Sequence, residues 1–152
     1  MNRENLKNKK ILITGGAGLL GVSLTKLFIS LEAEVVSTYY NRPPPKKYIN
    51  YYHKYDFNNY EDCFKATLNM DYVIIASVQA LGVKGMLESP TASILPNLNI
   101  HAGLFEACAQ NCVEKVVWVS SSSVYQEAFY PIAEDNLDLN KPTFELYQGI
   151  GW

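Results

Sequence analysis

Three glycines at intervals of three residues are the strongest chemical signal in the chain. Gly15, Gly18 and Gly21 stand between a short apolar run, residues 11–14, and an amphipathic stretch. In a strand–turn–helix, the first glycine permits a tight turn, the second lets the backbone approach a diphosphate, and the third lets helix and strand pack closely. The amino end of the helix would hold the phosphates through free N–H groups and its dipole. The pattern predicts dinucleotide binding; the alternative is a turn that only connects two elements.

A run of four serines, residues 120–123, follows the last predicted strand and precedes Val124-Tyr125. Serines commonly cap strand ends and form turns through their backbone bonds, which is the structural interpretation. Open parallel sheets bind their ligands at the carboxyl ends of the strands. We therefore favour a functional serine at this place.

The end of the second predicted strand bears on the choice of cofactor. NAD enzymes commonly place Asp or Glu there to bind the ribose 2′-hydroxyl, whereas residues 37–42 read STYYNR and hold no acid. Arg42 would instead pair with a 2′-phosphate in the bidentate manner that a guanidinium favours. This predicts NADP rather than NAD; the alternative is a solvated arginine beside a proline turn.

Hydrophobic periodicity predicts the elements that position these residues. Strands are expected within residues 11–14, 34–38, 48–55, 71–77 and 116–120, the last as a buried strand, and helices at 20–31, 58–68 and 97–111. The first helix should bury one face, formed by Leu20, Leu24, Leu27, Phe28 and Leu31. Pro43-Pro44-Pro45 favours extended backbone, and a loop with Gly82, Gly85 and Pro90 is expected before the third helix. Alternation of strand and helix predicts an open, doubly wound α/β sheet whose strands pair in parallel.

Composition excludes several classes of protein. The 152 residues are 48% hydrophobic and carry 13 cations against 15 carboxylates, which suits one globular domain and gives no broad basic face for nucleic acid. The first ten residues are polar, and no apolar run approaches the roughly 20 residues of a membrane helix, so we expect a cytoplasmic protein without membrane contact. His101, Cys108 and Cys112 share a helical spacing, but a fourth ligand is missing and we expect no metal site.

Several motifs together resemble the extended short-chain dehydrogenases, the NAD-dependent epimerase/dehydratase family. The glycine motif and the serine run before Val124-Tyr125 are similar to the family's, with Gln126 in place of a glycine. Asn97, 28 positions before Tyr125, resembles the family's helix asparagine. Residues 75–83 and 97–100 look most like the GDP-fucose synthase subgroup and its sugar-nucleotide relatives.

The resemblance implies a Rossmann-type fold and a set of site residues. Asp56 resembles the acid that approaches the adenine, and residues 76–78 resemble the small-residue segment after the fourth strand. The cofactor-binding residues that we expect are Gly15, Gly18, Leu19, Leu20, Gly21, Arg42, Asp56, Phe57, Ala76, Ser77 and Asn97.

Family resemblance also implies a catalytic serine and tyrosine. Ser121, four residues before Tyr125, would hydrogen-bond the reacting oxygen, although its neighbours could take that role. Tyr147 fits the catalytic base, but position 151, where the family has a lysine, is Gly151. An unassisted tyrosine has a pKa near 10, so only about one molecule in a thousand is phenolate at pH 7. Either the lysine lies beyond the truncation in a shifted arrangement, or this segment transfers no proton and Tyr147 is an ordinary amphipathic tyrosine at a helix start.

The activity that this resemblance implies is hydride transfer at a carbon of a nucleotide-sugar, with NADP or NAD, serving epimerisation, reduction or dehydration. Residues 1–152 would be the cofactor-binding domain alone, and we expect the chain to be incomplete, with its substrate lobe absent and an exposed sheet edge. Family members often pair through helices, so the partner that the resemblance implies, besides the substrate, is a second copy of the chain in a homodimer. The alternative from another class is a non-catalytic dinucleotide-binding module.

Overall fold

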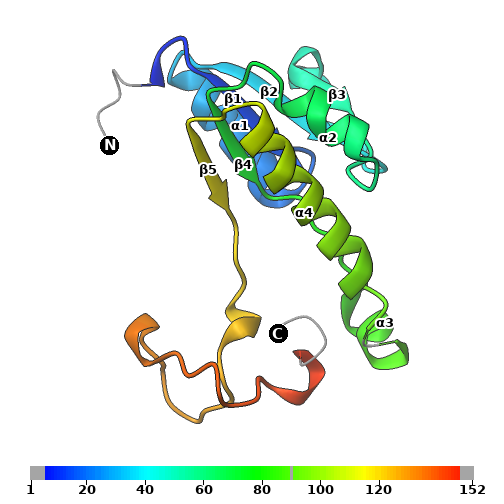
Figure 1. Ribbon diagram of the computed structural model, residues 1–152, viewed down its shortest axis with the longest axis vertical. Coiled ribbons are helices and arrows are strands. Elements are labelled where there is room, and N and C mark those ends of the chain that lie inside the picture. Colours follow the sequence, from blue (N-terminus) through cyan, green and yellow to red (C-terminus); the bar gives the residue numbers. More distant parts are fainter. Residues whose placement is uncertain (1–5, 90, 148–152) are drawn as a thin grey trace. The chain divides into compact units, whose positions relative to one another are not determined.

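A five-stranded parallel sheet forms the core of the computed structural model, which describes residues 6–89 and 91–147 (Figure 1). The strands lie in the order β3-β2-β1-β4-β5, and every neighbouring pair is parallel. The chain therefore leaves β1 in one direction and later returns to its other side, so the order reverses between β1 and β4. In chain order the strands are β1 (Lys10–Thr14), β2 (Glu34–Tyr39), β3 (Tyr52–Lys54), β4 (Tyr72–Ile75) and β5 (Lys115–Trp118).

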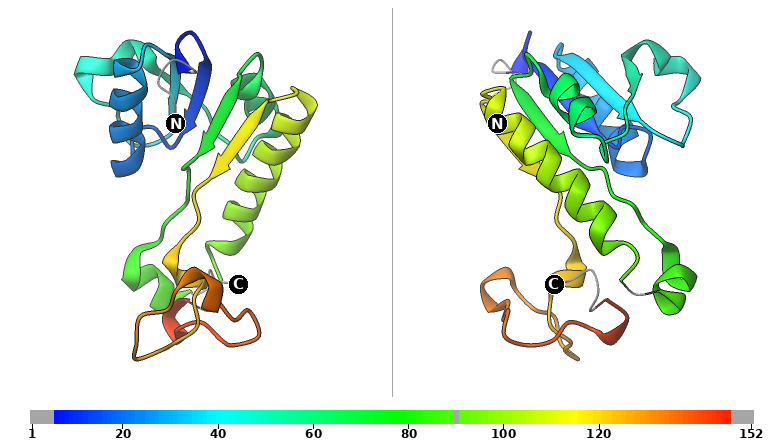
Figure 2. Two further views of the ribbon diagram at one scale, coloured as in Figure 1. Left: turned by 90° about the vertical axis from the view of Figure 1, so that its left-hand side faces the viewer. Right: turned by 45° about the vertical axis from the view of Figure 1, so that its right-hand side comes forward.

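Helices cover both faces of this sheet, which confirms the doubly wound prediction (Figure 2). Successive side chains of a strand point to opposite faces. Ile11 and Ile13 of β1 thus pack with Phe28 of the first helix, while Leu12 packs with Leu104 on the other face. The helices concerned are α1 (Leu19–Ser30) on one side and α2 (Tyr60–Thr67) and α4 (Ile94–Gln110) on the other.

The buried face of α1 differs from the predicted one. Gly21, Thr25 and Phe28 are its buried residues, whereas Leu20 and Leu27 are 44% and 50% exposed. Leu24 and Leu31 do pack beside the core, as predicted. The prediction was wrong for Leu20 and Leu27 because close packing at a glycine and a buried hydroxyl contact, rather than leucine spacing, orient this helix.

Two helices approach closely on the opposite face. The Asn59 side chain caps α2 by accepting the N–H of Glu61 at 3.0 Å. A Cβ atom at Gly103 of α4 would lie only 3.1 Å from the Cys63 sulfur of α2, so the glycine allows this approach. Burial raises the pKa of the Cys63 and Cys108 thiols to about 11. These cysteines therefore act as small apolar side chains at the helix crossing.

Two segments after β4 differ from the prediction. Residues 82–88, expected in a loop, form the short helix α3 (Gly82–Glu88), which includes a Lys84–Glu88 ion pair at 3.8 Å. Helix α4 begins at Ile94, three residues before the predicted start. Pro96 is compatible with this longer helix because it lies in the first turn, where a backbone N–H has no intrahelical acceptor.

The last strand, β5, was predicted to be buried and is not. Val117 and Trp118 are each 48% exposed, and β5 pairs with β4 alone among the described residues. The Trp118 ring meets His101 and Phe105 of α4 edge-on, with centroids 5.6 and 6.4 Å apart. The apolar sequence identified a strand correctly, but it does not reveal whether another strand lies beside it.

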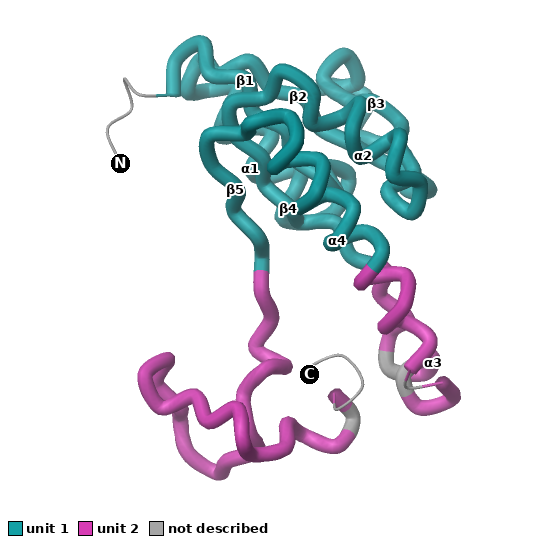
Figure 3. The backbone as a smooth tube through the Cα atoms, viewed as in Figure 1, with its two compact units in different colours: residues 1–78, 99–119 teal, residues 79–98, 120–152 magenta. Residues whose placement is uncertain are grey.

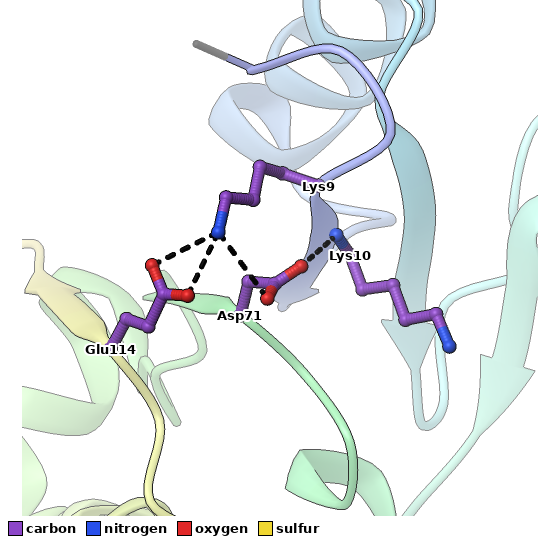
Figure 4. A network of polar contacts seen from close by, with 4 residues as sticks. All are labelled: Lys9, Lys10, Asp71 and Glu114. Atoms are coloured by element: carbon purple, nitrogen blue, oxygen red, sulfur yellow. Dashed lines mark hydrogen bonds and ion pairs between the residues drawn. The ribbon is translucent and has the colours of Figure 1, made fainter.

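A charged network joins the amino ends of three strands (Figure 4). The Lys9 ammonium lies 2.8 Å from a Glu114 oxygen and 3.5 Å from Asp71. The other Asp71 oxygen accepts the backbone N–H of Lys10 at 2.7 Å. This backbone hydrogen bond, followed by the charge of Lys9, lowers the pKa of Asp71. The network ties the start of β1 to the segments that enter β4 and β5.

The chain divides into two compact units, which Figure 3 colours separately. The first comprises residues 1–78 and 99–119 and holds the whole sheet; the second comprises residues 79–98 and 120–152. After β5 the chain forms short 3-10 helices. The candidate residue Ser121 precedes η3 (Ser122–Val124), and Tyr147 is the last residue of η5 (Glu145–Tyr147). Among the described helices, none has the length and apolar character to cross a bilayer.

Candidate dinucleotide site

The turn after β1 has the geometry that its glycines predict. Gly15 has a φ of 65°, in the left-handed region where a side chain is strained. A Cβ atom there would also lie 2.7 Å from the Ala76 carbonyl oxygen, beyond the end of β4. Gly15 is therefore required both for the turn and for the close approach of the neighbouring strand end.

Two further glycines, which have no side chain, allow helix α1 and strand β2 to pack closely against this turn. A Cβ at Gly21 would overlap the Gly15 carbonyl oxygen and lie 2.5 Å from the Gly16 α-carbon. A Cβ at Gly16 would lie 2.8 Å from the Ser37 Cβ of β2. Gly16 was missing from the predicted site, although the G-x-G spacing that begins there signals it. Gly18 has more room, since its Cβ would meet the Gly15 oxygen at 3.1 Å.

The amino end of α1 offers free backbone donors. Gly18 is the N-cap residue, and no side chain caps the helix. The N–H of Val22 makes the first intrahelical bond, to the Gly18 carbonyl at 3.0 Å, so the N–H groups of Leu19 and Leu20 precede the helical ladder. The first turn holds no acidic residue. Such an end suits an anion, and glycine at the cap leaves room for one.

Three buried hydroxyl groups support the turn from beneath, and sequence analysis missed all of them. Thr25 of α1 donates to the Gly21 carbonyl at 2.7 Å and also contacts the Ser37 hydroxyl. Tyr52 of β3 donates to the Gly16 carbonyl at 3.0 Å. We call Thr25, Ser37 and Tyr52 the hydroxyl cluster. A Thr, a Ser and a Tyr at these separations form no recognisable motif, so only the fold brings them together.

Thr14 joins the glycine turn to the segment after β4. Its hydroxyl accepts the N–H groups of Ala76 and Ser77 at 3.1 and 3.2 Å and donates to the Ser77 hydroxyl at 2.9 Å. A ring nitrogen of His101 lies 3.1 Å from the Ser77 carbonyl oxygen. The structure thus brings the predicted residues Ala76 and Ser77 beside Gly15, at the carboxyl ends of neighbouring strands.

Other predicted cofactor residues lie at the exits of β2 and β3. Asp56 accepts the backbone N–H and the side-chain amide of Asn58 at 3.1 and 3.0 Å, and these bonds lower the pKa of Asp56. The nearby Asp56 carboxylate raises the pKa of Tyr40 through its charge, and the Lys54 ammonium lies 6.0 Å from the Tyr40 ring centroid. The Asp56 carboxylate is therefore already engaged by its neighbours.

Arg42 and Phe57 have different surroundings. Arg42 is exposed in the bend after β2. Phe57 is buried in the core beside α2 and α4, and its ring stacks on Tyr55 with centroids 6.1 Å apart. The Phe57 side chain therefore packs in the core, and only its backbone remains available for a ligand.

Asn97, Ser121 and Tyr147 are the predicted site residues that belong to the second unit. Asn97 accepts the N–H of Gln79 at 2.8 Å and donates to the Gln79 and Ser93 carbonyls at 3.0 and 2.8 Å. It thereby fixes the backbone that follows the small-residue segment. The amide of Asn97 thus makes hydrogen bonds to backbone groups of Gln79 and Ser93, and its role as a cofactor-binding residue stays a prediction.

The candidate catalytic residues occupy short local turns. Ser121 caps η3, and its exposed hydroxyl oxygen accepts the N–H and the hydroxyl of Ser123 at 3.2 and 3.0 Å. The Tyr147 ring is half-buried and lies 5.9 Å from the Phe144 ring. Gly151, at the position of the family's lysine, lies outside the described residues.

The three residues that suggested a metal site do not share a helical face. Cys112 lies beyond the end of α4 and has a φ of 54°, while Cys108 is buried inside the core. Within residues 6–89 and 91–147, no group of three or more His, Cys, Asp or Glu side chains could hold a metal ion.

Comparison with known proteins identifies the family. The sequence model of the NAD dependent epimerase/dehydratase family matches residues 11–148. The chain belongs to this family. It is 32% identical to the uncharacterized protein MJ1055 of Methanocaldococcus jannaschii over 149 residues, which cover 86% of this chain and 45% of that protein.

Solved structures agree on the fold. Epimerase Mth375 from Methanothermobacter thermautotrophicus superposes with a TM-score of 0.77 at 21% identity, covering 98% of this chain and 46% of that one. A GDP-D-glycero-L-gluco-heptose synthase from Campylobacter jejuni, solved in the presence of NADPH, gives 0.71 at 20% identity, covering 99% and 40%. The chain thus spans less than half the length of these relatives.

Proposed function

We propose that this chain binds NADP, in preference to NAD, as the cofactor-binding portion of an enzyme that transfers hydride at a carbon of a nucleotide-sugar. The observation that carries the proposal is the start of α1: uncapped N–H groups stand behind a turn whose glycines are required by backbone contacts. A diphosphate would accept hydrogen bonds from Leu19 and Leu20 there. Membership of the NAD dependent epimerase/dehydratase family supports the reaction class.

The preference for NADP rests on the end of β2. No carboxylate stands within residues 37–42, and Arg42 is exposed beside the strand end. A guanidinium there would attract a 2′-phosphate, whereas a ribose 2′-hydroxyl would lack its usual acidic partner. The heptose synthase of similar fold was solved in the presence of NADPH, which agrees with this preference.

Ser121 and Tyr147 are the residues to which we assign the chemistry on the substrate. When bound, the cofactor would supply or accept the hydride. Ser121 would orient the reacting oxygen through its hydroxyl, and Tyr147 would hold or release the hydroxyl proton. The nucleotide-sugar substrate is supported by the GDP-linked sugar in the name of that heptose synthase.

Calorimetric titration of the 152-residue chain tests the cofactor proposal. We expect NADP⁺ to bind about tenfold more tightly than NAD⁺, because a charge-assisted pair contributes on the order of 1.5 kcal/mol. Arg42→Ala should remove this difference, while Lys65→Ala, a cation on the exposed side of α2, should retain it. Tighter binding of NAD⁺, or indifference to Arg42→Ala, would reject the preference for NADP.

A non-catalytic dinucleotide-binding module is the second candidate, favoured by Gly151 at the family's lysine position. It predicts normal cofactor binding without turnover. A protein expressed from the complete coding sequence should distinguish the two: nucleotide-sugar turnover that Tyr147→Phe abolishes supports the enzyme, and cofactor binding without turnover supports the module.

A further inference from the structure

The hydroxyl cluster joins a helix and two strands beneath the glycine turn. Thr25 comes from α1, Ser37 from β2 and Tyr52 from β3, and all three are buried, with Tyr52 only 7% exposed. Buried hydroxyl groups are costly unless they are hydrogen-bonded, so each of the three requires a partner.

The three hydroxyl hydrogens find acceptors within the turn and the cluster. Thr25 donates to the Gly21 carbonyl and Tyr52 to the Gly16 carbonyl. Ser37 then donates to the Thr25 oxygen, which is also 3.4 Å from the Tyr52 hydroxyl. Two of the three acceptors are therefore carbonyl groups of the glycine motif, one in the turn and one in the first turn of α1.

The bond from Tyr52 fixes the plane of one peptide group. A peptide is planar and trans, so its C=O and the following N–H point in opposite directions. Holding the Gly16 carbonyl toward Tyr52 directs the N–H of Ala17 away from the Tyr52 hydroxyl. Gly16 has no side chain to restrict its own dihedral angles, so an external contact is needed to select one orientation.

We propose that Tyr52 is a positioning residue for diphosphate binding, acting through the Gly16 peptide on the free N–H groups at the start of α1. This inference rests on the proposed function, since it assumes that the turn receives a dinucleotide. Gly16 lies between Gly15, which is in close contact with Ala76 after β4, and Gly18, which is the N-cap residue of α1. A shift at Gly16 would therefore displace the cap relative to the strand end.

Tyr52→Phe tests the proposal because it removes one oxygen and keeps the ring in the core. Two ligands are compared: NADP⁺, which contains a diphosphate, and 2′-AMP, which has the adenosine and 2′-phosphate but no diphosphate. We expect the Kd of NADP⁺ to rise about fivefold, the effect of one hydrogen bond, and the Kd of 2′-AMP, followed by NMR titration, to stay within about twofold.

Tyr55→Phe is the matched control. Tyr55 follows β3 closely, and its ring stacks on Phe57 away from the glycine turn, so the same chemical change there should leave both Kd values unchanged. If Tyr52→Phe does not fold, Ser37→Ala replaces it. Without the hydrogen bond from Ser37, the Thr25 oxygen is free to accept the hydrogen of the Tyr52 hydroxyl, which lies 3.4 Å away. The Tyr52 hydroxyl would then leave the Gly16 carbonyl, and the affinity for NADP⁺ should fall while that for 2′-AMP is kept.

The outcomes separate this inference from the proposed function. Selective weakening of NADP⁺ binding supports the positioning role. Equal weakening of both ligands, or reduced stability with unchanged binding of NADP⁺, overturns it and leaves Tyr52 a structural residue. A wild-type chain that binds no NADP⁺ rejects the proposed function and the inference together.

Discussion

The glycine turn and the serine run carry the two halves of the proposed chemistry, and they are held in very different ways. Residues far apart in sequence surround the turn. The Ala76 carbonyl leaves no room for a side chain at Gly15, and the Tyr52 hydroxyl donates a hydrogen bond to the Gly16 carbonyl. Ser121, by contrast, bonds to Ser123, two residues away. The first region is built into the sheet, whereas the second depends on local turn chemistry.

This difference separates the proposed cofactor binding from the proposed catalysis in physical terms. A turn fixed by long-range backbone contacts is set once the sheet folds, so its donors are already oriented for a ligand. The exposed Ser121, at the N-cap of a short 3-10 helix, keeps more freedom, and a bound substrate would have to order it.

The largest effect is expected for Gly21→Ala. The new Cβ would overlap the Gly15 carbonyl oxygen, and backbone atoms cannot move aside as a flexible side chain can. We expect the free energy of unfolding to fall by about 3 kcal/mol, measured by urea denaturation. Ser122→Ala, in the exposed serine run, should change it by less than about 0.5 kcal/mol. Similar losses for both variants would contradict the comparison.

A smaller loss is expected for Asn97→Ala, because Asn97 supplies three hydrogen bonds to backbone groups of the second unit. Removing it leaves the N–H and C=O of Gln79 without this partner, and we expect local stability to fall by about 1–2 kcal/mol. Faster hydrogen exchange at the Gln79 amide would report it. Asn99→Ala, at an exposed position of the same helix, is the control, and equal exchange in both variants would refute the effect.

Acid sensitivity should also differ between the two regions. Asp71 joins segments 61 residues apart by accepting the Lys10 N–H, whereas Asp138 accepts the N–H of nearby Asn140; both bonds lower the carboxyl pKa. A lowered pKa adds stability that is complete above the ordinary value of 3.8 and is lost as the pH falls through the folded value.

Asp71→Asn should therefore flatten the decline of the urea midpoint below about pH 4, relative to the wild type. Asp138→Asn removes a contact between residues only two apart, which can persist in the unfolded chain, so it should flatten the acid branch of that curve less than Asp71→Asn does. If Asp138→Asn flattened the acid branch more than Asp71→Asn, the acid-sensitive contact would lie in the second unit.

The smallest effect on stability is expected for Ser121→Ala. Its bonds reach only Ser123, so we expect a change within about 0.5 kcal/mol of the wild type in urea denaturation. NADP⁺ binding should be unchanged as well, because Ser121 is assigned to substrate. A loss above about 1 kcal/mol would show that the serine run is held more firmly than its local contacts indicate.

Features with a local cause could be predicted from sequence. The glycine turn follows from φ angles and close packing at three fixed positions, and alternating strands and helices imply the parallel sheet. The exposure of Leu20 depends on how α1 meets Gly16, and that of Val117 on which strand lies beside β5. Neither relation is contained in hydrophobic periodicity.

Much of the support for the candidate site could not be predicted for the same reason. Thr25, Ser37 and Tyr52 lie on separate elements and meet only because β2 and β3 add to the sheet in that order. The family resemblance named Asn97 as a cofactor residue, but it gave no sign of the hydrogen bonds that the Asn97 side chain makes to the backbone of Gln79.

The helix crossing at Gly103 allows the transient separation of α2 and α4 to be measured with a natural cysteine. Cys63 lies against that glycine, and a thiol that is both buried and weakly acidic can be alkylated only while the two helices part. The exposed Cys112 reacts without such an opening and calibrates the reagent in the same sample. The rate of labelling at Cys63, distinguished by peptide mapping from the second buried thiol at Cys108, would yield the free energy of separating α2 from α4 without any introduced probe.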